Sequence, residues 1–121
     1  GDNNIRVSLF IDADKRQIDA AIACGAPVIE IHTGHYADAV SSDERELKYN
    51  EIKKACKYAH NLGLQVNAGH GLTLENTFDI AKINSIVELN IGHSIISRAV
   101  FVGLANATTE MKALMLEARG L

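Results

Sequence analysis

Residues 64–71 read Leu64-Gln65-Val66-Asn67-Ala68-Gly69-His70-Gly71, an alternating apolar and polar strand that ends in a histidine between two glycines. Glycine has no side chain to pack and lets the backbone approach a bound group, so this corner favours a site over a core position. A similar corner, Asn90-Ile91-Gly92-His93, also follows an apolar run and precedes a helical pattern. The two corners predict a site for a phosphorylated small molecule, with a histidine placed for proton transfer.

The order of a strand followed by a helix occurs four times around these corners. Strands are predicted near residues 5–11, 28–32, 64–68 and 86–91. Helices are predicted over residues 14–24, 43–61, 74–83 and 94–118, the last interrupted near Gly103. This spacing suits βα units of a parallel sheet. We therefore expect an α/β chain with four parallel βα units, forming a single partial domain over residues 1–121 without a linker.

Each predicted strand has one apolar face and one mainly polar face. The apolar faces comprise Ile5, Val7, Leu9 and Ile11, then Ile29 and Ile31, then Leu64, Val66 and Ala68, and finally Val87, Leu89 and Ile91. Strands covered by helices on both sides read as nearly continuous apolar runs, which these strands do not. The polar faces predict the interior of a barrel. The alternative is a one-sided layer whose polar face meets solvent.

A barrel raises a question of length. Eight βα units need about 250 residues, and this chain of 121 residues provides four. Four parallel strands would leave the outer two with unpaired backbone groups. We therefore expect a half-barrel that associates with itself or with another chain.

Composition and charge exclude several classes of protein. The net charge of −3 gives no reason to expect nucleic acid or an anionic membrane as a partner. No apolar run approaches the roughly 20 residues that span a bilayer, and the N-terminus lacks the pattern of a leader. The two cysteines, Cys24 and Cys56, are expected to be free thiols of a cytoplasmic protein.

Five stretches in order carry a resemblance that covers the chain after Asn4. They are residues 7–14 (VSLFIDAD), 30–34 (EIHTG) with 36–38 (YAD), 66–73 (VNAGHGLT), 88–93 (ELNIGH) and 115–120 (MLEARG). Together they resemble the C-terminal half of the pyridoxine 5'-phosphate synthase family. The N-terminal half of that family, with its own acid/base histidine and glutamate, has no counterpart in this sequence.

The resemblance implies a fold and a reaction. Members of the family are (β/α)8 TIM barrels with extra helices that assemble into octamers in the bacterial cytoplasm. They condense 1-deoxy-D-xylulose 5-phosphate with 3-amino-1-hydroxyacetone 1-phosphate. The products are pyridoxine 5'-phosphate, inorganic phosphate and water, in one route to vitamin B6. The resemblance implies phosphorylated small molecules as substrates, a homo-oligomer, and no metal or organic cofactor.

The resemblance also implies roles for individual residues. His70 matches a catalytic histidine that donates a proton, and histidine is the side chain that gains and loses protons near neutral pH. Glu30 matches an inward-facing glutamate that stabilises charge in the transition state. Gly71, Gly92 and His93 match positions that bind a substrate and its phosphate. The alternatives without a catalytic role are that His70 is a surface-loop histidine and that Glu30 forms a structural ion pair with Arg6.

Other polar residues are expected to have no catalytic role. His32 and His35 have a spacing that suits a metal, but metal sites usually need three or four ligands and no third is evident. We therefore predict no metal site. Asp14 is predicted to cap a helix, and the segment 117–119 to be a surface helix end.

Two hypotheses about function remain, one for an enzyme and one for a non-catalytic binding module. In the first, the chain is half of a transferase of vitamin B6 biosynthesis and is inactive by itself. In the second, it is a non-catalytic α/β module that binds a phosphorylated metabolite or only assembles.

Overall fold

The computed structural model describes residues 2–121, in which four parallel strands form one sheet in the order β1-β2-β3-β4. The strands are β1 (Ser8–Ile11), β2 (Val28–His32), β3 (Gln65–Gly69) and β4 (Ile86–Asn90). Because neighbours in the sheet are also consecutive in the chain, each connection crosses over through helical segments, as in a (β/α)8 barrel. The predicted fold class is confirmed: the architecture is that of half such a barrel.

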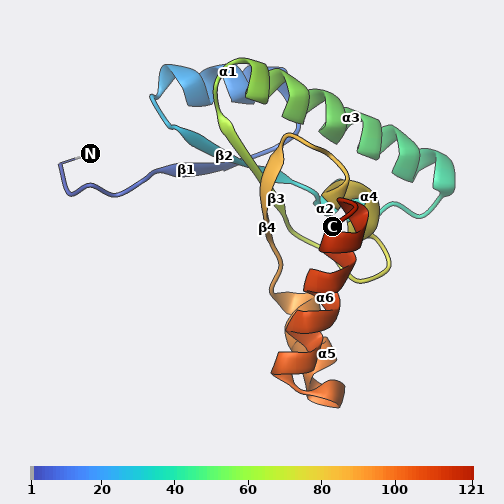
Figure 1. The fold of residues 1–121 in the computed structure, drawn as a ribbon. Coiled ribbons are helices and arrows are strands. Elements are labelled where there is room, and N and C mark those ends of the chain that lie inside the picture. Colours follow the sequence, from blue (N-terminus) through green and yellow to red (C-terminus); the bar gives the residue numbers. More distant parts are fainter. Residues whose placement is uncertain (1) are drawn as a thin grey trace.

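Six helices accompany the strands within residues 2–121. They are α1 (Lys15–Ala23), α2 (Gly34–Ala37), α3 (Ser42–Asn61), α4 (Thr77–Ala81), α5 (His93–Val102) and α6 (Leu104–Ala118). Helices α1 and α3 pack against each other along one side of the sheet, whereas α5 and α6 pack together and project away from it (Figure 1). The predicted break near Gly103 is confirmed, but the short helix α2 lies where the sequence predicted a loop.

The start of α1 shows how the sequence directs a helix. The side chain of Asp14 accepts a hydrogen bond of 2.8 Å from the backbone N–H of Arg16, which confirms Asp14 as the N-cap. Ser41 does the same for α3, accepting from the backbone N–H of Glu44 at 3.1 Å.

The core lies between the apolar face of the sheet and the helices α1 and α3. Ile29 and Ile31 on β2 and Val66 on β3 are completely buried there, together with Ile18 of α1 and Cys56 of α3. Each such aliphatic side chain contributes about 1.5–3 kcal/mol by leaving water. The apolar faces of β2 and β3 therefore hold the sheet against the two helices, and the polar faces turn the other way.

The apolar face predicted for β4 is wrong at its first residue. Val66 pairs with Ile86, but the next residue, Asn67, pairs with Glu88, so Val87 is an extra residue at an irregularity in the ladder. As a result Ile86 is buried while Val87 is 70% exposed. A bulge of this kind reverses which alternate residues face the core, and strict alternation does not reveal it.

The first strand is shorter than predicted. Pairing of β1 with β2 begins at Ser8 opposite Val28, and residues 5–7 precede the strand. Ile5 and Val7 are 70% and 47% exposed. β1 is an edge strand and pairs only with β2 within residues 2–121. The segment before it, residues 5–7, therefore has no strand on its outer side in the described part of the chain.

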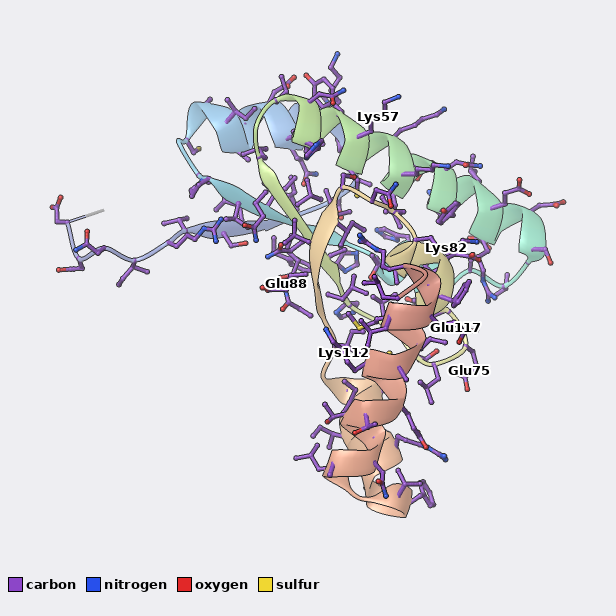
Figure 2. All side chains as sticks on the ribbon, viewed as in Figure 1. Lys57, Glu75, Lys82, Glu88, Lys112 and Glu117 are labelled. Atoms are coloured by element: carbon purple, nitrogen blue, oxygen red, sulfur yellow. The ribbon has the colours of Figure 1, made fainter. Side chains whose placement is uncertain are left out.

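The outer surfaces of the helices carry charge. Lys57 on α3, Lys82 next to α4 and Lys112 on α6 are exposed (Figure 2). Among residues 2–121, no helix combines the length and apolar character that crossing a bilayer demands. Both cysteines are free, as predicted; Cys24 is exposed, and burial raises the pKa of the Cys56 thiol to about 12.

Arg119 closes the fold at the end of α6, a role that the sequence did not indicate. Its Nη2 donates to the backbone carbonyls of Ile83 at 3.0 Å and Ile86 at 2.6 Å, and its Nε donates to that of Ala81. These carbonyls lie at the end of α4 and the start of β4. The guanidinium therefore ties the C-terminal helix to the last βα connection.

We expect Arg119→Ala to lower the free energy of unfolding by about 2 kcal/mol, because hydrogen bonds from a charged donor are lost and carbonyls lose their partner. Urea denaturation followed by circular dichroism measures the change. Arg16→Ala serves as the control, since the Arg16 side chain is 92% exposed. Equal stability of the two variants would contradict this role for Arg119.

Candidate active site

A cavity of about 520 Å³ lies at the carboxyl ends of β2, β3 and β4. Its walls include all five residues predicted for the site, namely Glu30, His70, Gly71, Gly92 and His93. Phe10, Leu72, Thr73, Asn90, Ile91 and Ser94 complete the lining. In (β/α)8 barrels the active site lies at this end of the strands. The structure thus brings together predicted site residues that are up to 63 positions apart in the sequence, from Glu30 to His93.

The corner around His70 has an unusual backbone. His70 has a φ of 88°, in the left-handed region that residues with a Cβ rarely adopt. Thr33, fully buried, holds this corner: its Oγ1 lies 2.7 Å from the carbonyl oxygen of Gly69 and 2.6 Å from that of His70. Its backbone N–H also donates to the Gly69 carbonyl at 2.8 Å. The exposed imidazole of His70 is therefore presented to the cavity from a fixed backbone.

Gly69 lets the acidic side chain of the site come close. A Cβ at this position would lie 2.6 Å from Oε1 of Glu30 and 2.6 Å from the carbonyl oxygen of Asn90. Only glycine fits between these two groups. The other carboxylate oxygen of Glu30 accepts a hydrogen bond of 3.0 Å from Nδ2 of Asn90. The carboxylate is thus positioned between the ends of β3 and β4, half-buried.

The alternative of an ion pair between Arg6 and Glu30 is wrong. Arg6 instead donates to Oε1 of Gln65 at 2.5 Å. Gln65 donates to Asn67 at 3.1 Å, and Asn67 donates to Glu88 at 3.3 Å. These side chains form a polar chain across the face of the sheet that turns away from α1 and α3. That face is the one that lines the interior in a (β/α)8 barrel.

The second corner places a helix start at the cavity. Helix α5 begins at His93, and Gly92 before it supplies no side chain to cap the first turn. The first backbone N–H groups of a helix lack partners within it and favour an anion. Oγ of Ser94 donates to the carbonyl of Leu72 at 2.6 Å, which ties this helix start to the loop that follows His70.

His32, which the sequence suggested only as a possible metal ligand, is a neighbour of His70. Their rings stack at 4.8 Å between centroids and an angle of 21°, and Phe10 lies 5.0 Å from His32 on another side. Burial lowers the pKa of His32, and repulsion from His70 and His35 adds to this effect. Both effects favour the neutral form of the His32 imidazole. The sequence could have indicated this residue through its position two residues after Glu30, because alternate residues of a strand lie on the same face.

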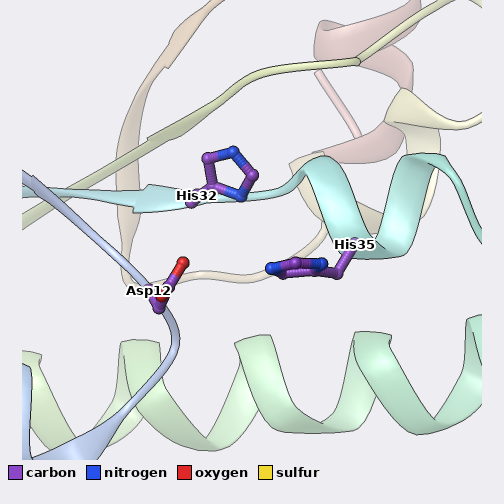
Figure 3. Close-up of side chains that lie close together, drawn as sticks. All are labelled: Asp12, His32 and His35. Atoms are coloured by element: carbon purple, nitrogen blue, oxygen red, sulfur yellow. The ribbon is translucent and has the colours of Figure 1, made fainter.

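The conclusion that His32 and His35 have no third partner is wrong. Asp12, directly after β1, brings a carboxylate oxygen into the group, so that one ligand atom from each of the three residues lies within 4.8 Å of the others. Figure 3 shows the Asp12 carboxylate directed at the ring of His32, with the ring of His35 reaching back from α2. Asp12 is far from the histidines in sequence, and only the sheet brings it near.

The fold and the cavity define a class: an α/β chain of the (β/α)8 type with its polar groups at the carboxyl ends of the strands. Comparison with known proteins identifies the family. The profile of the family described as "Pyridoxal phosphate biosynthesis protein PdxJ" matches residues 1–117. The chain belongs to this family, which confirms the resemblance seen in the sequence.

Three curated relatives, each named pyridoxine 5'-phosphate synthase, are similar over nearly the whole chain. The protein of Photobacterium profundum is 58% identical over 118 residues, which is 98% of this chain and 49% of the relative. That of Colwellia psychrerythraea is 62% identical over 115 residues, with shares of 95% and 47%. That of Idiomarina loihiensis is 52% identical over 118 residues, with shares of 98% and 49%. The chain spans about half the length of the curated relatives it matches.

The lowered pKa of His32 predicts how stability depends on pH. Below the ordinary histidine pKa of 6.5 the unfolded chain takes up a proton at this position more readily than the folded chain. The contribution of the neutral His32 to the free energy of unfolding is therefore fully present above pH 6.5. It is lost as the pH falls toward the lowered pKa of His32 in the folded chain. We expect His32→Gln to lose less stability than the wild type between about pH 7 and pH 5.5.

Urea denaturation at the two pH values, with a chelator present, measures this difference. His60→Gln is the matched control, because His60 is an exposed histidine at the end of α3. A His32→Gln variant with the full pH dependence of the wild type would show that His32 does not contribute to it.

Proposed function

We propose that this chain provides one half of the active site of a pyridoxine 5'-phosphate synthase, a transferase of pyridoxal phosphate biosynthesis. The reaction joins 1-deoxy-D-xylulose 5-phosphate to 3-amino-1-hydroxyacetone 1-phosphate and yields pyridoxine 5'-phosphate, phosphate and water. The observation that carries the proposal is the single cavity lined by Glu30, His70, Gly71, Gly92 and His93. Relatives with this name that are more than half identical support it.

His70 and Glu30 have complementary roles in this proposal. Ring closure requires protons to reach the oxygens that leave, and an imidazole on a fixed backbone suits that transfer. A cationic imine or amine forms during the reaction, and the Glu30 carboxylate stabilises its positive charge. Asn90 holds that carboxylate by the hydrogen bond of 3.0 Å, so its orientation is set before substrate arrives.

The phosphate of a substrate is proposed to bind at the start of α5. A Cβ on Gly92 would contact nothing within 4 Å, so the space around this residue is open to a ligand. His93 and Ser94 line the same cavity and contribute first-turn N–H groups. Gly71, in the loop after His70, also lines this cavity. A phosphate between these two corners would lie next to the proton donor.

The remaining groups for catalysis are proposed to come from a second set of four βα units. β1 and β4 are the edge strands of the sheet, and Phe10 on the polar face of β1 is 55% exposed. Edge strands with free backbone groups favour pairing with further strands. The assembly is proposed to act in the cytoplasm on small phosphorylated molecules, without nucleic acid or membrane as partners. As in the family, it is proposed to be a homo-oligomer.

A second candidate is a module that binds a phosphorylated metabolite without turnover. It is favoured by the open polar face of the sheet, which no helix covers within residues 2–121 (Figure 1). Binding of inorganic phosphate by the chain alone, with no activity in any mixture, would support this candidate over the first.

We expect no pyridoxine 5'-phosphate from the chain alone and measurable product when it is mixed with the N-terminal half of the Photobacterium profundum relative. Product requires the mixture because, in this proposal, this chain and the N-terminal half of the relative each contribute half of the acid/base groups. In the mixture, His70→Asn is expected to lower the rate by about 100-fold or more, as removal of a general acid does. Product is measured by chromatography.

His60→Asn is the control for this experiment, since the exposed His60 lies outside the cavity. Turnover by the chain alone would contradict the half-site. Wild-type rates in the His70→Asn mixture would remove His70 from the mechanism.

We also expect the chain alone to self-associate at micromolar concentration, because its two edge strands and the exposed apolar residues beside them lack partners. Light scattering coupled to size exclusion measures the mass. A stable, folded species of 13.1 kDa would contradict this expectation.

A further inference from the structure

A group of side chains outside the proposed catalytic cavity has the composition of a metal site. Asp12, His32 and His35 place one carboxylate oxygen and two imidazole nitrogens within 4.8 Å of one another. Carboxylate and imidazole are the ligand types that bind zinc and similar divalent transition metals. We propose that these three residues form a binding site for such an ion. Neither the family nor the proposed reaction accounts for this site.

The sheet explains why the three residues meet. β1 and β2 are paired in register, with Ile11 opposite Ile31, so Asp12, directly after β1, lies beside His32, the last residue of β2. Helix α2 begins at Gly34, directly after the strand end. Its first turn brings His35 over the same point, as Figure 3 shows. The three ligands thus come from the residue after β1, the last residue of β2 and the first turn of α2, whose positions the fold determines.

The candidate ligand atoms have few competing partners. Nδ1 of His32 accepts only a long hydrogen bond of 3.3 Å from the backbone N–H of Gly34, so an ion bound at this nitrogen has one weak contact to displace. Asp12 receives only a long hydrogen bond of 3.4 Å from Gln17 on its carboxylate. Within residues 2–121 the imidazole of His35 makes no hydrogen bond to the protein.

The surroundings provide space and charge for an ion. A cavity of about 160 Å³ adjoins the three residues and has room for water as a further ligand. Lys48 and Glu51 also line this cavity, but they form an ion pair of 3.1 Å with each other. No ion pair within residues 2–121 involves Asp12, so its negative charge is available to an ion at the site. Three protein ligands with an open position are typical of accessible zinc centres.

Titration of the whole chain with Zn²⁺, followed by calorimetry, tests the proposal. A Cys24→Ser background removes the exposed thiol, which would otherwise bind zinc. We expect one ion per chain and a thermal midpoint that rises with Zn²⁺. His35→Ala and Asp12→Asn are each expected to weaken binding by about 10-fold or more, since loss even of a supporting partner has that effect.

His60→Ala, the matched control, is expected to bind Zn²⁺ like the parent. Circular dichroism of each variant without metal verifies that it is folded, and both ligand positions are exposed, so little packing is lost. Binding that persists in His35→Ala and Asp12→Asn but disappears in His70→Ala would place the ion in the catalytic cavity and overturn the proposal. Absence of binding up to about 100 µM Zn²⁺ would also overturn it. No readout requires turnover, so the result is independent of the proposed function.

Discussion

The parallel pairing of β2 with β3 is the constraint on which the site depends. Its register sets Glu30 opposite Asn67 and His32 opposite Gly69. Thr33 extends the ladder by one more hydrogen bond to the Gly69 carbonyl, and its buried hydroxyl reaches the next carbonyl, that of His70. The left-handed backbone of His70 is thereby held by a neighbouring strand. Without this pairing, neither the histidine nor the glutamate would face the cavity.

His32 lies between the two candidate sites at this end of the sheet. One side of its ring stacks on His70, and its other neighbours include Phe10, His35 and Asp12. The orientation of the His32 ring is therefore restricted by residues of both the candidate active site and the candidate metal site. Because interiors are packed closely, a group that fixes one side of the ring also restricts the other. This coupling is a consequence of three strand ends meeting at one edge of the sheet.

Much of the fold followed from local patterns. Strand alternation predicted which face of β2 and β3 is buried, and Asp14 and Gly103 marked the start of one helix and the break between two others. The bulge at Val87 did not follow, because an extra residue in one strand is visible only when its partner is aligned. The carbonyl contacts of Arg119 did not follow either, since backbone acceptors carry no sequence signal.

The sequence alone determined the four βα units, the two Gly-His corners and the family, because each depends on residues close together in the chain or on matched stretches. Only the tertiary structure decided which distant residues meet. It set Asn90 rather than Arg6 beside Glu30, and it brought Asp12 to His32 and His35. The physical reason is that register and strand order, which arise from packing of the whole sheet, determine which side chains become neighbours at the strand ends.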